Sequence, residues 1–300
     1  MLKTLLVIVG PTAVGKTETA LSVAEQLHCP IISADSRQVY RELKIGTATP
    51  TAEQLQRVKH YLVGHRSVAD YYSAYEFEQD VLKLLDTLFV QHDVVLLTGG
   101  SMMYVDAVCN GIDLIPTISA EVRQQVWTEY EEKGLDFMLG KLHSLDPEYY
   151  NKVDKCNYKR VLHAIEVCIE AGQTYTSLRT NSKVERKFRI VKVGIERERV
   201  ELNQRIGMRV EQMIEQGLEA EVRSCLPMRH YNSLNTVGYK EIFDYFDGKM
   251  SRDEAIEKIK TNTRRYAKKQ MTWFKQNGNY VWFDATDNML VDKIIALLDK

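Results

Sequence analysis

The sequence predicts an α/β fold in which a parallel sheet is flanked by helices and carries an all-helical insertion. Two observations support this prediction. Short apolar runs alternate with amphipathic segments between residues 5 and 97, as they do where parallel strands are joined by crossover helices. From residue 111 to about residue 180 the periodicity is helical, without intervening strands.

Composition sets the broad class of the protein. The 300 residues suffice for a substantial core, and 44% hydrophobic with 27% charged residues is typical of soluble globular chains. The longest apolar run, Leu5–Val9, is too short to cross a bilayer, and no signal-peptide pattern begins the chain. We therefore expect a cytoplasmic protein that binds no membrane.

The first strand and helix enclose a glycine-rich turn. Leu5–Val9 is short and rich in β-branched residues, which is typical of a fully buried strand. Gly15 opens an amphipathic helix that runs through Leu27. The turn between them is the first candidate for a binding site.

Two further apolar runs lead to polar residues. Ile31 and Ile32 precede Asp35, and Val94–Leu97 leads through two glycines to Ser101. Because the carboxyl ends of parallel strands meet at one edge of a sheet, Asp35 and Ser101 are expected to face the glycine-rich turn.

The helical stretch is predicted to be an insertion. Ser119 is a suitable N-cap for a helix that Gly134 ends, a second helix continues toward residue 146, and Gly172 ends a third. These features place the insertion at residues 112–187 and the core at residues 1–111 and 188–300.

The chain then returns to the core. Arg189–Ile195 alternates like a strand and is expected to rejoin the sheet. A helix follows up to Gly217, with one apolar face and with Arg205 and Arg209 together on the adjacent face.

The glycine-rich turn fits the phosphate-binding P-loop motif, G-x-x-x-x-G-K-[ST], after a strand and at the start of a helix. Backbone N–H groups, the lysine charge and the helix N-terminus suit phosphate oxygens, and the Thr17 hydroxyl suits Mg²⁺. The fold is therefore predicted to be P-loop NTPase-like, with a phosphate site at Gly10, Pro11, Thr12, Ala13, Val14, Gly15, Lys16 and Thr17.

The motif alone leaves the reaction open. A P-loop small-molecule kinase would hold ATP there and use Asp35 to activate a hydroxyl, whereas a nucleotide-binding regulatory module would perform no chemistry. Asp35 itself is either a base or the cap of a turn. The run ending at Gly100 carries no acid that could hold the metal of a kinase.

Six segments together resemble the tRNA dimethylallyltransferases, also called tRNA isopentenyltransferases or IPP transferases. The segments occur in the family's order and extend over nearly the whole chain. They are the P-loop, Ala34–Tyr40, Ile45–Ala48, Gly99–Tyr104, Val237–Glu241, and Thr263–Arg265 continuing to Trp273-Phe274.

The resemblance implies transfer of a dimethylallyl group from dimethylallyl diphosphate to N6 of the adenosine next to the anticodon, assisted by Mg²⁺. The P-loop would hold the diphosphate leaving group rather than ATP. Asp35 would accept the proton of the amine, and Lys16 and Arg209 would stabilise the departing diphosphate. Ser101 would be a further catalytic residue; it stands where the family usually has threonine, which keeps the hydroxyl.

The resemblance also implies contacts with tRNA, whose target base would be flipped into the protein. His163 replaces a usual arginine, and Thr49 replaces a common lysine. The insertion would contact the anticodon arm, and the enzyme would act as a monomer without an obligate protein partner. The implied contact residues are Asp35, Ser36, Arg37, Gln38, Ser101, Arg123, Lys159, Arg160, Val161, Leu162 and His163.

A basic segment near the C-terminus independently favours RNA. Residues 258–275 contain seven Lys or Arg and no acid, although the net charge of the chain is −1. As a helix, the segment would place Ile259, Tyr266 and Trp273 on one apolar stripe with basic flanks that can meet phosphates. A solvated basic helix would show the same pattern.

Overall fold

The computed structural model describes residues 2–180 and 184–299. Residues 1, 181–183 and 300, which belong to the predicted core and insertion, lie outside the described residues. The chain forms two compact units, of which unit 1 comprises Met1–Cys109 and Glu185–Lys300, and unit 2 comprises Asn110–Val184. Arg186, expected within the insertion, lies in unit 1 because its guanidinium is bonded to buried Glu78 and to the carbonyl of Val108.

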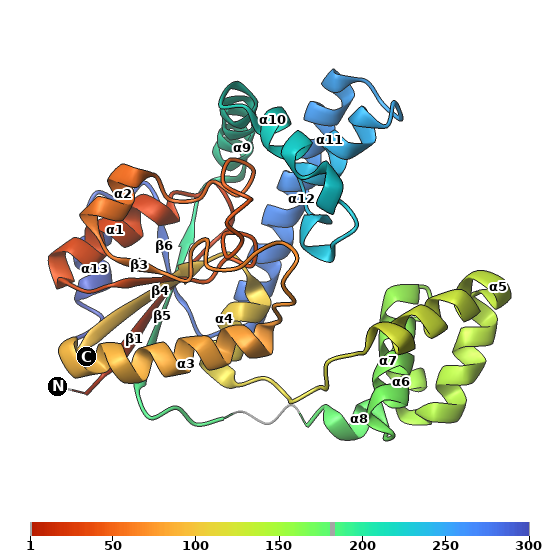
Figure 1. The fold of residues 1–300 in the computed structure, drawn as a ribbon. Helices are drawn as coiled ribbons and strands as arrows, with labels where there is room; N and C mark the ends of the chain where they lie inside the picture. The colour runs from red at the N-terminus through yellow and green to blue at the C-terminus, as the bar shows by residue number, and fades with distance from the viewer. Residues whose placement is uncertain (1, 181–183, 300) are drawn as a thin grey trace. The chain divides into compact units, whose positions relative to one another are not determined.

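Unit 1 is built on a six-stranded, wholly parallel sheet of order β3-β2-β4-β1-β5-β6 (Figure 1). This confirms the predicted fold class, the three strands predicted from apolar runs and the fourth predicted from the alternation of residues 189–195. The two edge strands, β3 and β6, were not predicted, because they are short and lack fully buried residues. The strands are β1 (Thr4–Val9), β2 (Ile31–Ser33), β3 (His60–Tyr61), β4 (Val94–Gly99), β5 (Arg189–Glu196) and β6 (Val281–Asp284).

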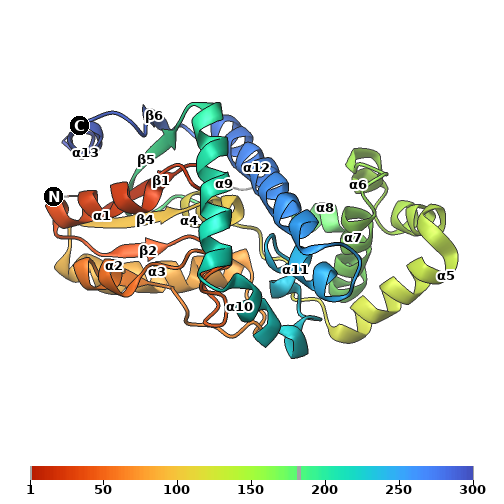
Figure 2. The ribbon, with the colours of Figure 1, turned by 90° about the horizontal axis from the view of Figure 1, so that it is seen from above.

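Helices cover both faces of the sheet (Figure 2). The helices of unit 1 are α1 (Lys16–Leu27), α2 (Ala52–Arg57), α3 (Ala74–Gln91), α4 (Met102–Asn110), α9 (Arg199–Glu215), α10 (Leu218–Ser224), α11 (Tyr239–Phe246), α12 (Arg252–Asn277) and α13 (Leu290–Ile295). Two short 3₁₀ turns, Leu226–Met228 and Asn232–Leu234, lie between α10 and α11.

Successive residues of β1 enter different cores, which is why this run reads as continuously apolar. Leu5 and Val7 pack in a cluster with α3 and α4, whereas Leu6 and Ile8 pack with α1 and α13. All four are fully buried. Burial of both faces fixes β1 in the middle of the sheet, with β4 on one side and β5 on the other.

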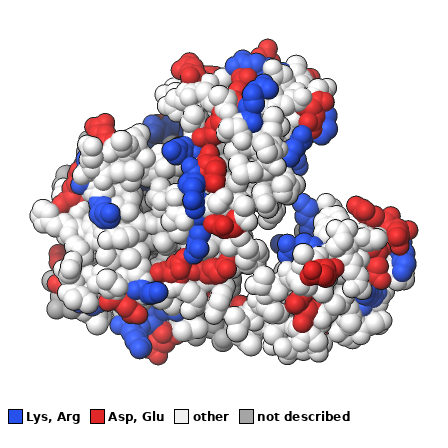
Figure 3. Space-filling model, viewed as in Figure 1, with Lys and Arg blue, Asp and Glu red and all other residues white. Residues whose placement is uncertain are grey.

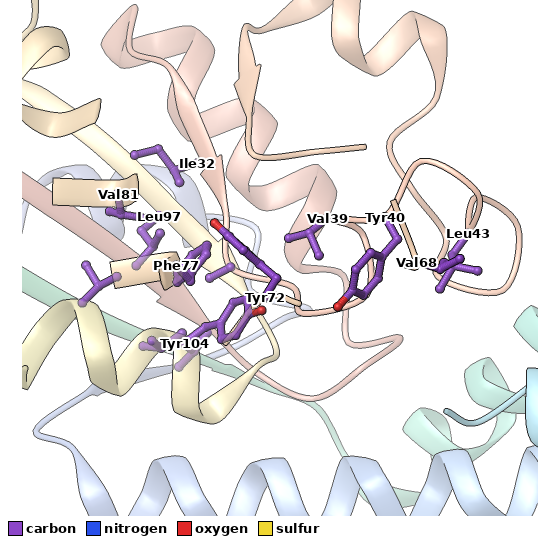
Figure 4. Packing of buried hydrophobic residues seen from close by; sticks show 14 of the residues in the cluster. Ile32, Val39, Tyr40, Leu43, Val68, Tyr72, Phe77, Val81, Leu97 and Tyr104 are labelled. Atoms are coloured by element: carbon purple, nitrogen blue, oxygen red, sulfur yellow. The ribbon is translucent and has the colours of Figure 1, made fainter. Parts of the chain in front are cut away.

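The first cluster contains an aromatic group that fixes the start of α4. The rings of Phe77 and Tyr104 are stacked with centroids 4.2 Å apart, and Tyr72 packs edge-on against Tyr104 (Figure 4). Such pairs add stabilisation beyond the burial of their area. They hold the turn between β4 and α4 at the carboxyl edge of the sheet.

In the described residues of unit 2, all regular secondary structure is helical. Ser119 caps α5 by accepting from the N–H of Val122, and Gly134, with φ 75° and ψ 179°, breaks the helix as predicted. Gly172, in the left-handed conformation, ends α7. The helices are α5 (Ala120–Leu145), α6 (Pro147–Lys152), α7 (Tyr158–Ala171) and α8 (Tyr175–Leu178).

Charges of both signs are mixed on the surface. On the face drawn in Figure 3, Lys and Arg are interspersed with Asp and Glu in both units. Every helix within the described ranges is too short or too polar to cross a membrane.

Candidate active site

The P-loop joins β1 to α1 and is held by contacts to its outer carbonyl groups. A Cβ on Gly10 would overlap the carbonyl oxygen of Ile195 in β5, so only glycine permits this close approach of the two strands. Ala13 has φ of 64°, a left-handed conformation that costs energy. Arg205 of α9 donates to its carbonyl at 2.9 Å, and Arg197 donates to that of Val14 at 3.3 Å.

The inner side of the loop carries unused donors. No acceptor among the described residues pairs with the N–H groups of Ala13, Gly15, Lys16 or Thr17. They lie at the N-terminus of a 12-residue helix, where the helix dipole adds partial positive charge. Unpaired N–H groups at such a position form a site for an anion with several oxygens.

Lys16 folds back over the loop. Its Nζ donates to the carbonyl oxygens of Gly10 at 2.9 Å and Pro11 at 2.7 Å. Desolvation lowers the pKa of Lys16 from its ordinary value to about 7, and the nearby charge of Arg209 lowers it further, whereas Asp35 acts in the opposite direction. A bound anion would favour the charged form of this lysine.

Arg209 of α9 is the second cation of the site. Burial lowers its pKa, and Asp35 opposes that effect. Its neighbour on the helix face, Arg205, holds the P-loop carbonyl described above. Of the predicted arginine pair, Arg205 thus bonds to the P-loop, and Arg209 lines the cavity that contains Lys16.

Asp35 follows β2 and caps the next turn. Its Oδ1 accepts from the N–H of Arg37 at 2.8 Å and of Gln38 at 3.2 Å, whereas no described group donates to Oδ2. The capping interpretation is thus confirmed. It leaves one carboxylate oxygen available for chemistry, so the two interpretations of Asp35 are compatible.

Ser101 and Gln38 are engaged inside the protein. The Ser101 hydroxyl, which is buried, accepts from the N–H of Ser36 at 2.7 Å and donates to its hydroxyl at 3.1 Å. The Gln38 amide donates to the carbonyls of Thr47 and Ala48, both at 3.1 Å. Both side chains stabilise the turn that begins at Asp35.

Two cavities meet at Asp35. The first, of about 460 Å³, contains Lys16 and Thr17, and the second, of about 390 Å³, contains Ser36 and Arg37. The second also has apolar walls, from Ile206, Val210, Met213, Val237 and Ile259. Four residues line both cavities, namely Thr12, Asp35, Arg209 and Tyr266. Ser101 is in neither lining.

Metal ligands are sparse. The described ranges contain no group of three or more His, Cys, Asp or Glu side chains that could hold a metal ion. Mg²⁺ differs from Zn²⁺ in often needing only one or two protein oxygens, with phosphate oxygens and water as its other ligands. The Thr17 hydroxyl, in the same cavity as Lys16, fits that kind of site.

The remaining predicted residues lie in unit 2. Val161 and Leu162 are buried in its apolar core, so their side chains cannot meet a ligand. They occupy the buried face of amphipathic α7. Exposed on these helices are the basic residues Arg123, Lys159 and Arg160, together with His163, whose Nδ1 lies 3.7 Å from Glu166.

Two side chains that line the first cavity were not predicted to act there, namely Tyr266 and Gln270. Tyr266 was expected on a docking stripe, yet it is 36% exposed and lines both cavities. The buried face of α12 is instead formed by Ala255, Ile259, Ala267, Gln270 and Phe274. The sequence signal for this buried face was that Gln270 falls at helical spacing from the apolar residues Ala267 and Phe274.

Comparison with known proteins identifies the family. Residues 38–277 match the IPP transferase family. The chain belongs to this family. The tRNA dimethylallyltransferase 1 of Bacteroides thetaiotaomicron is 59% identical over 280 residues, which are 93% of this chain and 91% of that protein. The protein of the same name from Bacteroides fragilis is 58% identical over 281 residues, 94% and 93% of the two chains.

Solved structures agree in fold. The tRNA isopentenylpyrophosphate transferase of Bacillus halodurans has a TM-score of 0.71 at 35% identity, covering 99% of this chain and 95% of that one. A eukaryotic dimethylallyltransferase acting on tRNA has a TM-score of 0.79 at 22% identity, covering 99% and 77%. The latter likeness concerns the fold alone.

Proposed function

We propose that this protein is a tRNA dimethylallyltransferase. It transfers the dimethylallyl group of dimethylallyl diphosphate to N6 of the adenosine on the 3′ side of the anticodon, position 37, and releases diphosphate. The main observation in support is that Asp35 and Arg209 line both cavities. The first cavity contains the P-loop residues Lys16 and Thr17, which suit a diphosphate, and the second has room for another reactant. The transferred group would therefore pass from the first cavity to the second at Asp35.

The diphosphate is proposed to bind in the P-loop. Unpaired N–H groups of Gly15, Lys16 and Thr17 would donate to its oxygens, as would the ammonium of Lys16. These groups surround the charge that develops when the bond from C1 of the allyl group to the diphosphate oxygen breaks. Arg209 would stabilise the same charge from α9.

Asp35 is the proposed general base. The adenine amine attacks C1 of the allyl group, a C–N bond forms, and the electrons of the broken C–O bond leave with diphosphate. The amine proton passes to a carboxylate oxygen of Asp35. Its Oδ2 suits this role because Oδ1 is held by the N–H groups of Arg37 and Gln38.

Mg²⁺ is the proposed metal cofactor. Thr17 would hold it together with diphosphate oxygens and water, in a site that needs no cluster of acids. Bound there, Mg²⁺ would neutralise part of the negative charge of the leaving group.

The tRNA is proposed to contact both units. Ser36 and Arg37 line the second cavity, where the adenosine would enter. Arg123, Lys159, Arg160 and His163 of the insertion would meet the anticodon arm, since exposed basic side chains suit phosphates. We infer a monomer that acts in the cytoplasm, where its tRNA substrate occurs.

A kinase is disfavoured. The chain's relatives are named tRNA dimethylallyltransferases, and β4 ends in Thr98 and Gly99 without an acid for the kinase metal. The deciding experiment follows radiolabelled dimethylallyl diphosphate in the presence of unmodified tRNA. Label in the tRNA, recovered after digestion as N6-isopentenyladenosine, is expected. Consumption of ATP with no label in tRNA would reverse the assignment.

A further inference from the structure

A single buried amide joins the P-loop to the turn after β4. Gln270 of α12 is 1% exposed. Its Oε1 accepts from the N–H of Thr12 at 2.9 Å, and its Nε2 donates to the carbonyl of Gly100 at 2.8 Å. The backbone N–H of Thr12 can only donate and the carbonyl of Gly100 can only accept, so these two groups fix the orientation of the Gln270 amide.

The two ends of this bridge belong to the two sides of the proposed reaction. Thr12 lies in the loop proposed to hold the diphosphate. Gly100 precedes Ser101, whose hydroxyl accepts from the N–H of Ser36 at 2.7 Å, next to Asp35. Gln270 therefore connects the leaving-group site with the turn that carries the base.

The space around the bridge suits glutamine. A Cβ on Gly100 would overlap Nε2 of Gln270, so glycine at this position leaves room for the amide. A leucine could neither accept from Thr12 nor donate to Gly100. An ionised glutamate could accept, but it would place negative charge against a carbonyl oxygen.

We propose that Gln270 is a positioning residue for prenyl transfer, which keeps the P-loop and the Asp35 turn in register through Thr12 and Gly100. This proposal rests on the proposed function. Loss of the bridge releases the loop that binds the diphosphate and shifts the base relative to it. The affinity for tRNA, which has further proposed contacts in the insertion, changes less than the affinity for dimethylallyl diphosphate.

The first variant is Gln270→Leu, compared with Gln276→Leu, the same change at an exposed position of the same helix. Steady-state prenyl transfer is measured with each substrate varied in turn. Gln270→Leu is expected to lower kcat/KM for dimethylallyl diphosphate about tenfold or more, with a smaller change in KM for tRNA. Gln276→Leu is expected to match the wild type.

The second variant, Gln270→Glu, distinguishes positioning from packing. A protonated glutamic acid has the shape of glutamine, accepts through its carbonyl oxygen and donates through its hydroxyl. The ratio of Gln270→Glu activity to wild-type activity at the same pH should therefore rise as pH falls from about 8.5 to about 6. Comparison at equal pH removes every pH effect that the two proteins share.

The outcomes separate the two proposals. Absence of prenyl transfer by the wild type overturns the proposed function. Wild-type transfer with an unchanged kcat/KM in Gln270→Leu, or a pH-independent activity ratio for Gln270→Glu, overturns the positioning role alone. If Gln270→Leu does not fold, the pH profile of Gln270→Glu still decides.

Discussion

Tyr239 donates a hydrogen bond of 2.5 Å to Glu221, whose carboxylate links two segments that carry the family resemblance, Val237–Glu241 and Ile45–Ala48. The same carboxylate accepts from the N–H groups of Lys44, Ile45 and Gly46 at 2.8–3.0 Å. Burial and the charge of Glu221 raise the pKa of Tyr239, which keeps its hydroxyl a donor. The loop beside the first cavity is thus shaped by a residue of α10.

Glu221→Ala should destabilise the protein. It leaves three backbone N–H groups and a buried hydroxyl without their acceptor, which costs about 1–3 kcal/mol or more in free energy of unfolding. Tyr239→Phe removes one donor and leaves the carboxylate paired, so its cost should be smaller, about 1 kcal/mol. Urea unfolding measures both, with Glu215→Ala at an exposed position of α9 as the control. If Glu221→Ala and Glu215→Ala lowered the free energy of unfolding equally, the hydrogen bonds of Glu221 would not stabilise the protein.

Asp35→Asn should separate the two roles of Asp35. Asparagine keeps an oxygen that can accept from the N–H groups of Arg37 and Gln38, but it is not a base. We expect turnover to fall by a factor of about 10² or more, with diphosphate binding and unfolding largely unchanged. Asp35→Ala should lose turnover equally and also destabilise the turn. If Asp35→Asn turned over at the wild-type rate, Asp35 would not be the general base.

Binding of diphosphate should take up a proton at Lys16. The pKa of this lysine is about 7 in the free protein, so at pH 8 most molecules carry it uncharged, and a bound anion raises that pKa. Calorimetry in buffers of different ionisation enthalpy should find uptake approaching one proton per site, relative to Lys16→Met. Identical proton exchange in the two proteins would show that Lys16 stays charged throughout.

The same depressed pKa predicts a pH dependence of stability. Below about pH 7 both folded and unfolded chains hold the proton, and above it the unfolded chain, with its ordinary pKa near 10.5, holds more. Stability from this group therefore rises with pH between about 7 and about 10. Denaturant unfolding should show this slope in the wild type and lose it in Lys16→Met. If stability rose equally with pH in the wild type and in Lys16→Met, the pKa of Lys16 would not be depressed in the folded protein.

The limits of sequence reasoning at this site follow from distance along the chain. The phosphate site of the P-loop was predictable because the signals for its strand, turn and helix are local in the sequence. The position of Asp35 beside it was predictable because the carboxyl ends of parallel strands lie at one edge of the sheet. Gln270, the partner of Thr12, is 258 residues away in the sequence. A single glutamine in a basic helix does not indicate which backbone groups its amide will bind. Ser101 was predicted as a catalytic residue and a contact for tRNA; its hydroxyl bonds to Ser36, a partner that the packing of the two turns selects.

Arg186→Met should be among the most damaging changes outside the active site. Arg186 pairs with Glu78, both buried, and donates to the carbonyls of Ala107 and Val108 at the end of α4. Removing the cation leaves a buried carboxylate uncompensated, which costs about 3–5 kcal/mol. The double variant with Glu78→Met should be less damaged than Arg186→Met alone. A double variant at least as unstable as the single one would show that the pair contributes through packing rather than charge.

Lys159→Ala and Arg160→Ala test the proposed tRNA contacts of unit 2. Each side chain is exposed on the first turn of α7, and each phosphate contact that is lost should reduce the slope of log K against log salt by about 1. Lys152→Ala is the matched control, because that lysine is exposed in the same unit but pairs with Glu148 at 2.5 Å. Binding is measured by filter retention of labelled tRNA over a range of salt. If all three variants keep the wild-type slope, the phosphates are held elsewhere, and the basic residues of α12 become the next positions to substitute.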